Sequence, residues 1–213
     1  MSALELAQSL IKIKSISPED GGCFDLIEAE LIPLGFQIEK IPELNCETLL
    51  AKYGDSGKVF CYLGHTDVVP SGPEDEWTSP PFEANIVEGE LIGRGAADMK
   101  GSVAVFIESV KKFLADHPNP NFQIWVMLTS NEEGEPADGK INTLMDALTD
   151  QNQFIDYCLV GEASSSDKVG DVLRVGRRGS LSGKLKLIGK QGHVAYPHKL
   201  SLIHISEPTR RRG

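Results

Sequence analysis

No stretch of the 213-residue sequence is apolar for long enough to cross a membrane, and its opening residues contain no signal-peptide core. Positive charge is scarce as well, because 21 lysines and arginines stand against 31 aspartates and glutamates, a net charge of −10. Nucleic acids and anionic membranes are polyanions, so this balance argues against a general binder of either. We therefore expect a cytoplasmic protein that binds neither, and an anionic substrate would need local arginines or metal ions.

The sequence also lacks a CxxC pair, an internal repeat and a low-complexity linker. Its four cysteines are far apart, at Cys23, Cys46, Cys61 and Cys158. Cys61 and Cys158 lie within apolar runs, so we expect both to be buried thiols in a reducing compartment.

Strand-like and helix-like patterns alternate along most of the chain. Continuous apolar runs at residues 59–65, 122–130 and 156–162 predict buried strands, and shorter strand-like runs occupy 36–41 and 48–54. Helical periods cover residues 4–11, 22–33, 101–116 and 141–148. This alternation is typical of an α/β protein with a mostly parallel sheet flanked by helices.

The pattern changes after residue 172. Alternating residues with glycine punctuation predict an antiparallel meander, and so the start of a second, α+β domain. We expect a first domain at 1–172 and the beginning of the second at 173–200. Residues 201–213 have no clear period and end in an arginine run. We interpret them as a non-native tail that resembles translated sequencing-adapter read-through; the alternative is a genuine basic tail.

Ionisable residues directly follow three of the apolar runs. In open α/β sheets the carboxyl ends of the strands form the ligand crevice, so residues at those ends should converge there. A further acid ends a glycine-rich turn just before the helix at 101–116. These residues are His65 and Asp67, Glu132 and Glu133, Glu162, and Asp98.

One histidine among several carboxylates suits Zn²⁺ or a similar divalent ion. There are more carboxylates than one tetrahedral ion uses, whereas two ions about 3.5–4 Å apart would share a bridging carboxylate. Without cations the acids would repel one another and raise their own pKa values. The sequence therefore predicts a site for two divalent ions, with Zn²⁺ as the first expectation and Co²⁺ as the alternative.

Each residue also has a simpler interpretation when it is taken alone. A single histidine is more often structural, and an aspartate before a helix, such as Asp98, is more often an N-cap. Asp67 and Glu162 could serve turns, and Glu132 and Glu133 could be solvated loop acids. Their shared position at strand ends favours the metal site over a plain α/β domain with capping acids.

Six strings in order carry a resemblance to a known family. They are GHTDVVP, GRGAADMKGS, TSNEEGE, VGEASS, VGRRGS and GKQGHVAYPH. With them the sequence resembles, over residues 1–200, the M20 family of metallo-amidohydrolases. The resemblance implies a zinc-peptidase-like catalytic domain that hydrolyses a small-molecule amide substrate.

The resemblance also implies roles for the strand-end residues. His65 and Glu162 would bind one metal ion, Glu133 would complete the ligands of the other, and Asp98 would bridge both. Asp67 would orient the His65 imidazole and raise its basicity.

By the same resemblance, Glu132 would be the general base, which takes a proton from the attacking water and passes it to the leaving amine. Gly134 would permit the turn that lets both neighbouring glutamates face the crevice.

Two further residues are implied in the second domain. His193 would reach the active site of a partner subunit in a homodimer and help to hold the substrate carbonyl. Arg178 would bind a substrate carboxylate, for which a planar guanidinium is suited. Arg174 and Arg177 are expected to be solvated.

Family members have about as much chain again beyond this point, which supplies one more histidine ligand. The only candidate here, His204, lies in the suspect tail, so we expect a fragment with an incomplete metal site. Three alternatives stay open: another amidohydrolase or metallo-carboxypeptidase of the family, a non-catalytic binding module, and an inactive truncated fragment.

Overall fold

The computed structural model of the chain describes residues 1–43, 46–134 and 140–176, together with residues 186, 188–190, 193 and 196. The backbone forms two units, Met1–Asp171 and Val172–Gly213, each described by itself. Among the described residues of the second unit, none belongs to a helix or strand. Most of the predicted meander and all of residues 201–213 lie outside the described residues, so both interpretations stay predictions.

A five-stranded sheet forms the centre of the first unit. In spatial order its strands are β1 (Gln37–Glu43), β2 (Cys46–Tyr53), β6 (Gln123–Thr129), β3 (Val59–His65) and β7 (Tyr157–Val160). β3 pairs in parallel with both β6 and β7, and β2 is antiparallel to both of its neighbours. Because β2 alone is reversed, the other four strands all run the same way. The expected α/β fold with a mostly parallel sheet is confirmed.

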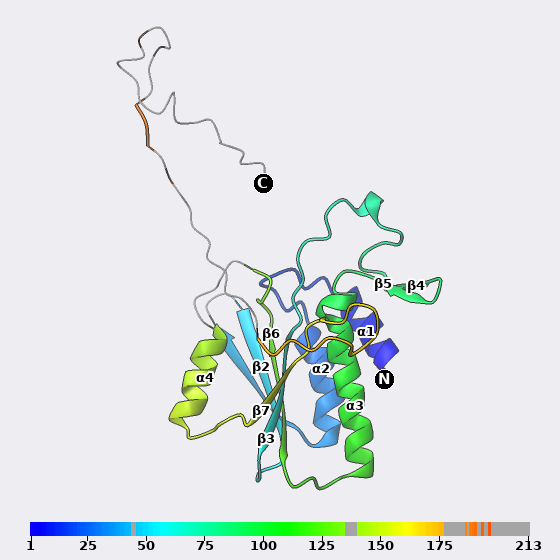
Figure 1. Cartoon of the computed structure of the whole chain (residues 1–213), viewed down its shortest axis with the longest axis vertical. Coiled ribbons are helices and arrows are strands. Elements are labelled where there is room, and N and C mark those ends of the chain that lie inside the picture. Colours follow the sequence, from blue (N-terminus) through cyan, green and yellow to red (C-terminus); the bar gives the residue numbers. More distant parts are fainter. Residues whose placement is uncertain are drawn as a thin grey trace. The chain divides into compact units, whose positions relative to one another are not determined.

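Helices cover both faces of this sheet (Figure 1). α1 (Ala3–Lys12), α2 (Cys23–Leu31) and α3 (Gly101–Asp116) bury their apolar sides in one core against one face of the sheet. α4 (Lys140–Asp150) packs on the opposite face over a second, smaller core. A short 3-10 turn, η1 (Ile32–Leu34), continues α2. No helix in the described ranges has both the length and the apolarity needed to cross a bilayer.

The local sequence of α1 determines where this helix begins and which of its faces is buried. Ser2 and Glu5 form a capping box, in which the Ser2 hydroxyl accepts from the Glu5 amide and the Glu5 carboxylate accepts from the Ser2 amide at 2.8 Å. The capped helix then buries one apolar stripe made by Leu6, Ala7, Leu10 and Ile11.

Several short elements were not predicted. β4 (Asn85–Val87) and β5 (Glu90–Ile92) form a small hairpin, and η2 (Glu74–Glu76) lies in the loop before it. η3 (Ala96–Lys100) is an irregular helical turn between this hairpin and α3, and it contains Asp98 with non-helical dihedral angles. These elements matter here because η3 brings Asp98 to the end of β3.

One burial prediction is wrong. β7 was expected to be a buried strand, but Tyr157, Leu159 and Val160 are 55%, 46% and 51% exposed. Cys158 is exposed too, whereas Cys61 is buried as expected. Among the described residues, β7 is the last strand of the sheet and pairs only with β3, so no described strand covers its other edge.

A buried lysine ties η3 to the end of α1. The Lys100 side chain is fully buried, and its Nζ donates at 2.8 Å to the carbonyls of both Leu10 and Ile13. Burial lowers the pKa of Lys100, although the nearby Cys23 and Asp20 oppose that shift. These carbonyls lie at the C-terminal end of α1, where each also accepts one main-chain N–H, from Ile13 and from Ser15 respectively.

We expect Lys100→Met to lower the free energy of unfolding by about 1–3 kcal/mol, because it keeps the side-chain stem but removes a donor from two buried carbonyls. Denaturant titration of the metal-free protein measures the change. Lys112→Met is the matched control, since the Lys112 side chain is exposed and forms a surface ion pair with Glu108; it should change stability by less than about 0.5 kcal/mol. Equal stability of the two variants would contradict this role for Lys100.

Candidate metal centre

The strand-end residues meet at one edge of the sheet. His65 is the last residue of β3, Glu132 and Glu133 follow β6, and Glu162 follows β7. Because these three strands are parallel, their carboxyl ends lie together. The turn η3 adds Asp98 to the same group, as its distance to His65 shows.

The His65 ring lies at the centre of this group. Its Nε2 is 3.1 Å from Asp98 Oδ1, 3.2 Å from Glu162 Oε1 and 4.0 Å from Glu132 Oε2. Two sets of donor atoms, one from His65, Asp98 and Glu162 and one from His65, Glu132 and Glu133, each lie within 4.8 Å of one another. Either set could hold a metal ion.

The hydrogen bonding of His65 fits a cation. The ring is only 1% exposed, and its Nδ1 is 2.9 Å from the main-chain carbonyl of Asp67. A carbonyl only accepts, so Nδ1 carries a proton, and Nε2 faces Asp98 and Glu162. Carboxylate oxygens are acceptors too, so the three groups need a shared proton or a cation between them. A divalent ion with nitrogen and oxygen ligands meets that need.

Electrostatics point the same way. Burial alone would lower the pKa of His65, but the hydrogen bond and charge of Asp67 outweigh it and raise the pKa to about 9. Burial raises the pKa of Glu132, and the charges of Glu162, Asp67 and Asp98 add to the rise. Burial also raises the pKa of Glu133, with Asp98 as its main like-charged neighbour. The negative electrostatic potential at this site favours the protonated form of His65 and disfavours the ionised forms of Glu132 and Glu133. The same negative potential attracts a metal cation.

Asp67 occupies a different place from the other acids. It is fully buried, and its Oδ1 and Oδ2 accept the main-chain N–H groups of Glu132 and Glu133 at 3.0 and 3.1 Å. Burial would raise the pKa of Asp67, but hydrogen bonds from His65, Ser17 and these two amides lower it. Its carboxylate is 3.5 Å from His65 Nδ1, farther than its own carbonyl.

The turn after β6 depends on close packing at Gly134. A Cβ at this position would lie 2.0 Å from Asn131 Oδ1, so no larger residue fits without movement. A larger residue would therefore require the Asn131 side chain to move, and the Gly134 backbone does not lie in the left-handed region. This turn presents Glu132 and Glu133 on the same side.

Sequence reasoning missed two contacts at the site. Ser17 Oγ donates to Asp67 Oδ2, and the His65 amide lies 3.3 Å from the Met99 sulfur. Neither had a sequence signal, because Ser17 lies in a polar link between two helices, 50 positions from Asp67. Asp98 does not cap α3, for which no side-chain cap is formed.

The second-unit residues stay predictions. Arg178 and Arg177 lie outside the described residues. His193 is described and exposed, with its ring centroid 6.0 Å from that of Tyr196. Arg174 is exposed, as expected for a solvated arginine.

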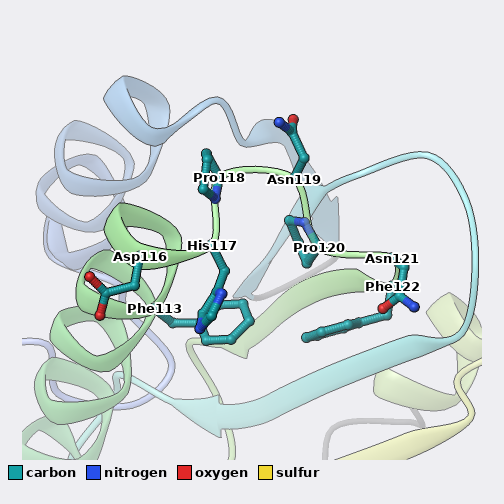
Figure 2. Close-up of a pocket in the computed structure, with 8 residues that line it drawn as sticks. All are labelled: Phe113, Asp116, His117, Pro118, Asn119, Pro120, Asn121 and Phe122. Carbon is teal, nitrogen blue, oxygen red and sulfur yellow. The ribbon is translucent and has the colours of Figure 1, made fainter.

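A clear hollow in the first unit lies elsewhere. Its volume is about 480 Å³. Figure 2 shows the residues that line it, Phe113 and residues 116–122, in the connection from α3 to β6. The connection enters β6 at its amino end, whereas the acids gather at the carboxyl ends of the strands. None of the clustered acids lines this hollow.

This fold and cluster belong to a recognisable class of protein. The sequence matches the model of Peptidase family M20/M25/M40 over residues 61–211, so the chain belongs to that family. The fold agrees with that of solved structures, including human carnosine dipeptidase 1 at a TM-score of 0.65 and 24% identity, covering 74% of this chain and 37% of that one. An M20 family metallo-carboxypeptidase from Sulfolobus solfataricus matches at a TM-score of 0.62 and 20% identity, over 76% and 38%.

Several relatives of about 50% sequence identity are named succinyl-diaminopimelate desuccinylase. Succinyl-diaminopimelate desuccinylase from Alkalilimnicola ehrlichii is 49% identical over 195 residues, which are 92% of this chain and 52% of that protein. The enzyme from Halorhodospira halophila is 51% identical over 210 residues, 98% and 55% respectively. The chain spans about half the length of the relatives it matches.

Proposed function

We propose that the full-length protein hydrolyses N-succinyl-LL-2,6-diaminopimelate to succinate and LL-2,6-diaminopimelate, in lysine and diaminopimelate biosynthesis. The observation that carries this proposal is the convergence of acids around His65. Carboxylate oxygens of Asp98 and Glu162 lie within 3.2 Å of His65 Nε2, and Glu132 and Glu133 lie beside them. The identity of about 50% to relatives named for this reaction supports the choice of substrate.

Four residues would hold two divalent ions, with Zn²⁺ as the first expectation and Co²⁺ as the alternative. His65 and Glu162 would bind one, Glu133 the other, and Asp98 both. Bound there, the ions would polarise the amide carbonyl and lower the pKa of the attacking water. His65 suits its role because its Nδ1–H is already committed to the Asp67 carbonyl, which fixes the ring and frees Nε2.

Glu132 would move the protons. Its carboxylate is half-exposed at the crevice, close enough to the cluster to reach a water held there. Burial raises the pKa of Glu132, and a higher pKa makes a carboxylate a stronger base. It would take one proton from the attacking water and deliver it to the leaving amine as the carbon–nitrogen bond breaks.

Two residues of the second unit would hold the substrate. Arg178 would pair with a substrate carboxylate, and His193 would act across a homodimer on the substrate carbonyl. Both assignments follow from the family motifs VGRRGS and GKQGHVAYPH.

A sibling activity, such as deacetylation of N-acetylornithine or a carboxypeptidase reaction, is the nearest competitor. With the zinc-loaded full-length protein we expect kcat/KM for N-succinyl-diaminopimelate to exceed that for N-acetylornithine by about 10²-fold or more, because the acetyl group has no carboxylate to pair with Arg178. Faster turnover of N-acetylornithine would overturn the substrate assignment, and hydrolysis of neither would overturn the reaction class.

Arg178→Ala sharpens this test. It should reduce turnover of the succinyl substrate about 10²-fold while changing turnover of N-acetylornithine little. Arg174→Ala is the matched control, since Arg174 is exposed nearby in the sequence, and it should leave both rates unchanged.

A further inference from the structure

An irregular segment between α1 and α2 runs beside the residues that follow β3. Ile16 and Val68 form a parallel bridge, the Ser17 amide donates to the Val68 carbonyl at 3.1 Å, and the Val68 amide donates to the Ser15 carbonyl at 2.9 Å. The fully buried Ser15 adds a hydrogen bond from its hydroxyl to the Thr66 carbonyl at 2.6 Å. The segment is therefore fixed by its main chain, and Ser17 is held beside Asp67 without relying on its own side chain.

The same segment also contacts the end of β6. Ser130 Oγ donates to the Pro18 carbonyl at 3.0 Å, and Ser17 Cβ would lie 3.5 Å from a Cβ at Gly134. The segment at 15–18 thus touches both β3 and the turn that carries Glu132 and Glu133. Asp67 contacts both sides, because its carboxylate accepts from Ser17 of the segment and from the two amides of the turn.

The Asp67 carboxylate has its acceptor positions almost filled. Oδ1 accepts the Glu132 amide, and Oδ2 accepts both the Glu133 amide and the Ser17 hydroxyl. A buried carboxylate needs such donors, because burial without them disfavours its charged form. The main-chain carbonyl of Asp67 meanwhile holds His65 Nδ1. The carboxylate therefore has the two amides of the turn as its main partners, while the carbonyl serves the ring.

We propose that Ser17 is a positioning residue that acts through Asp67: its hydroxyl fixes the carboxylate that clamps the Glu132–Glu133 turn against the strand carrying His65. This rests on the proposed function, in which those glutamates are the general base and a metal ligand. Loss of the hydroxyl frees one side of the carboxylate. The two amides then lose a fixed acceptor, and both glutamates move relative to His65.

The test uses Ser17→Ala in the full-length protein. Zinc affinity, measured by competition with a chelator, should fall about 10- to 100-fold, the usual range for partners that orient metal ligands. The kcat should fall by a similar factor with KM within about threefold, and the absorption bands of the Co²⁺-loaded protein should shift. Ser17→Thr, which keeps the hydroxyl, should restore zinc affinity and kcat to within about threefold of the wild-type values.

Ser15→Ala separates positioning from general stability. It deletes a buried hydroxyl of the same segment whose acceptor is the Thr66 carbonyl, so it should lower thermal stability at least as much as Ser17→Ala. Zinc affinity and the Co²⁺ spectrum should stay unchanged in Ser15→Ala. Equal losses of zinc affinity in both variants would overturn the proposal, because they would show a loosened segment rather than a loosened carboxylate.

A double-mutant cycle tests the route through Asp67. If Ser17 acts only through that carboxylate, the double variant Ser17→Ala/Asp67→Asn should have a kcat within about threefold of the kcat of Asp67→Asn alone. Independent, multiplying effects would overturn the proposal while leaving the enzyme assignment intact. A wild-type protein that binds no metal and hydrolyses no amide would instead remove the proposed function itself.

Discussion

Replacing Glu132 by glutamine lowers kcat for amide hydrolysis by about 10²–10⁴-fold, the range that a positioned general base contributes. Glutamine has nearly the same shape but cannot take a proton from water or return one to the leaving amine. Its main-chain amide still donates to Asp67, so the turn keeps its place. Steady-state kinetics and metal analysis of the same preparation measure the change.

The metal content separates this role from ligation. Glu132 lies near His65 in one of the two candidate donor sets, so geometry alone would also let it bind an ion. We expect Glu132→Gln to keep the wild-type metal content and a KM within about threefold. Loss of one ion would show that Glu132 is a ligand and that Glu133 needs to be reconsidered as the base. Glu90→Gln, at the exposed first residue of β5, is the matched control and should behave as wild type.

Replacing Asp98 by alanine has the second large effect. Asp98 is the acid assigned to both ions, and it sits 3.1 Å from His65 Nε2. Loss of the Asp98 carboxylate should reduce the bound metal from two ions to fewer than one per chain. It should also lower kcat/KM more than about 10³-fold, because the ions lower the activation barrier by several kcal/mol. Elemental analysis after dialysis, followed by kinetics, measures both.

Two comparisons make this result specific. Glu162→Ala should weaken binding of one ion and leave the other, because Glu162 is assigned only to the ion that His65 holds. Asp116→Ala, at the far end of α3, should change neither metal content nor rate. Retention of two ions in Asp98→Ala would contradict the bridging role.

The convergence of the strand-end residues could be predicted because it depends only on the direction of the strands. Parallel strands bring their carboxyl ends to one edge, so His65, Glu132 and Glu162 could be placed together without knowing the strand order. The apolar runs that mark these strands are the strongest pattern in the sequence. Asp98 was harder to place, because η3 is irregular and follows no period.

The parts that sequence reasoning missed have physical reasons. An apolar run does not reveal whether a strand is central or at an edge, so the exposure of β7 and Cys158 could not be read from it. The Ser17 contact joins residues 50 positions apart through an isolated bridge, which has no periodic signature. The roles of Asp67 were only partly predicted, because the family resemblance implies its relation to His65 and not its bonds to the turn after β6.

Residues from distant parts of the sequence, His65, Asp98, Glu133 and Glu162, are proposed to surround a pair of cations at one edge of the sheet. The most direct measurement is anomalous diffraction at the zinc absorption edge from crystals of the zinc-loaded full-length protein. We expect two peaks about 3.5–4 Å apart, one at His65 Nε2 and Glu162, the other at Glu133, with Asp98 touching both. Peaks located away from these side chains, or no peaks, would contradict the account.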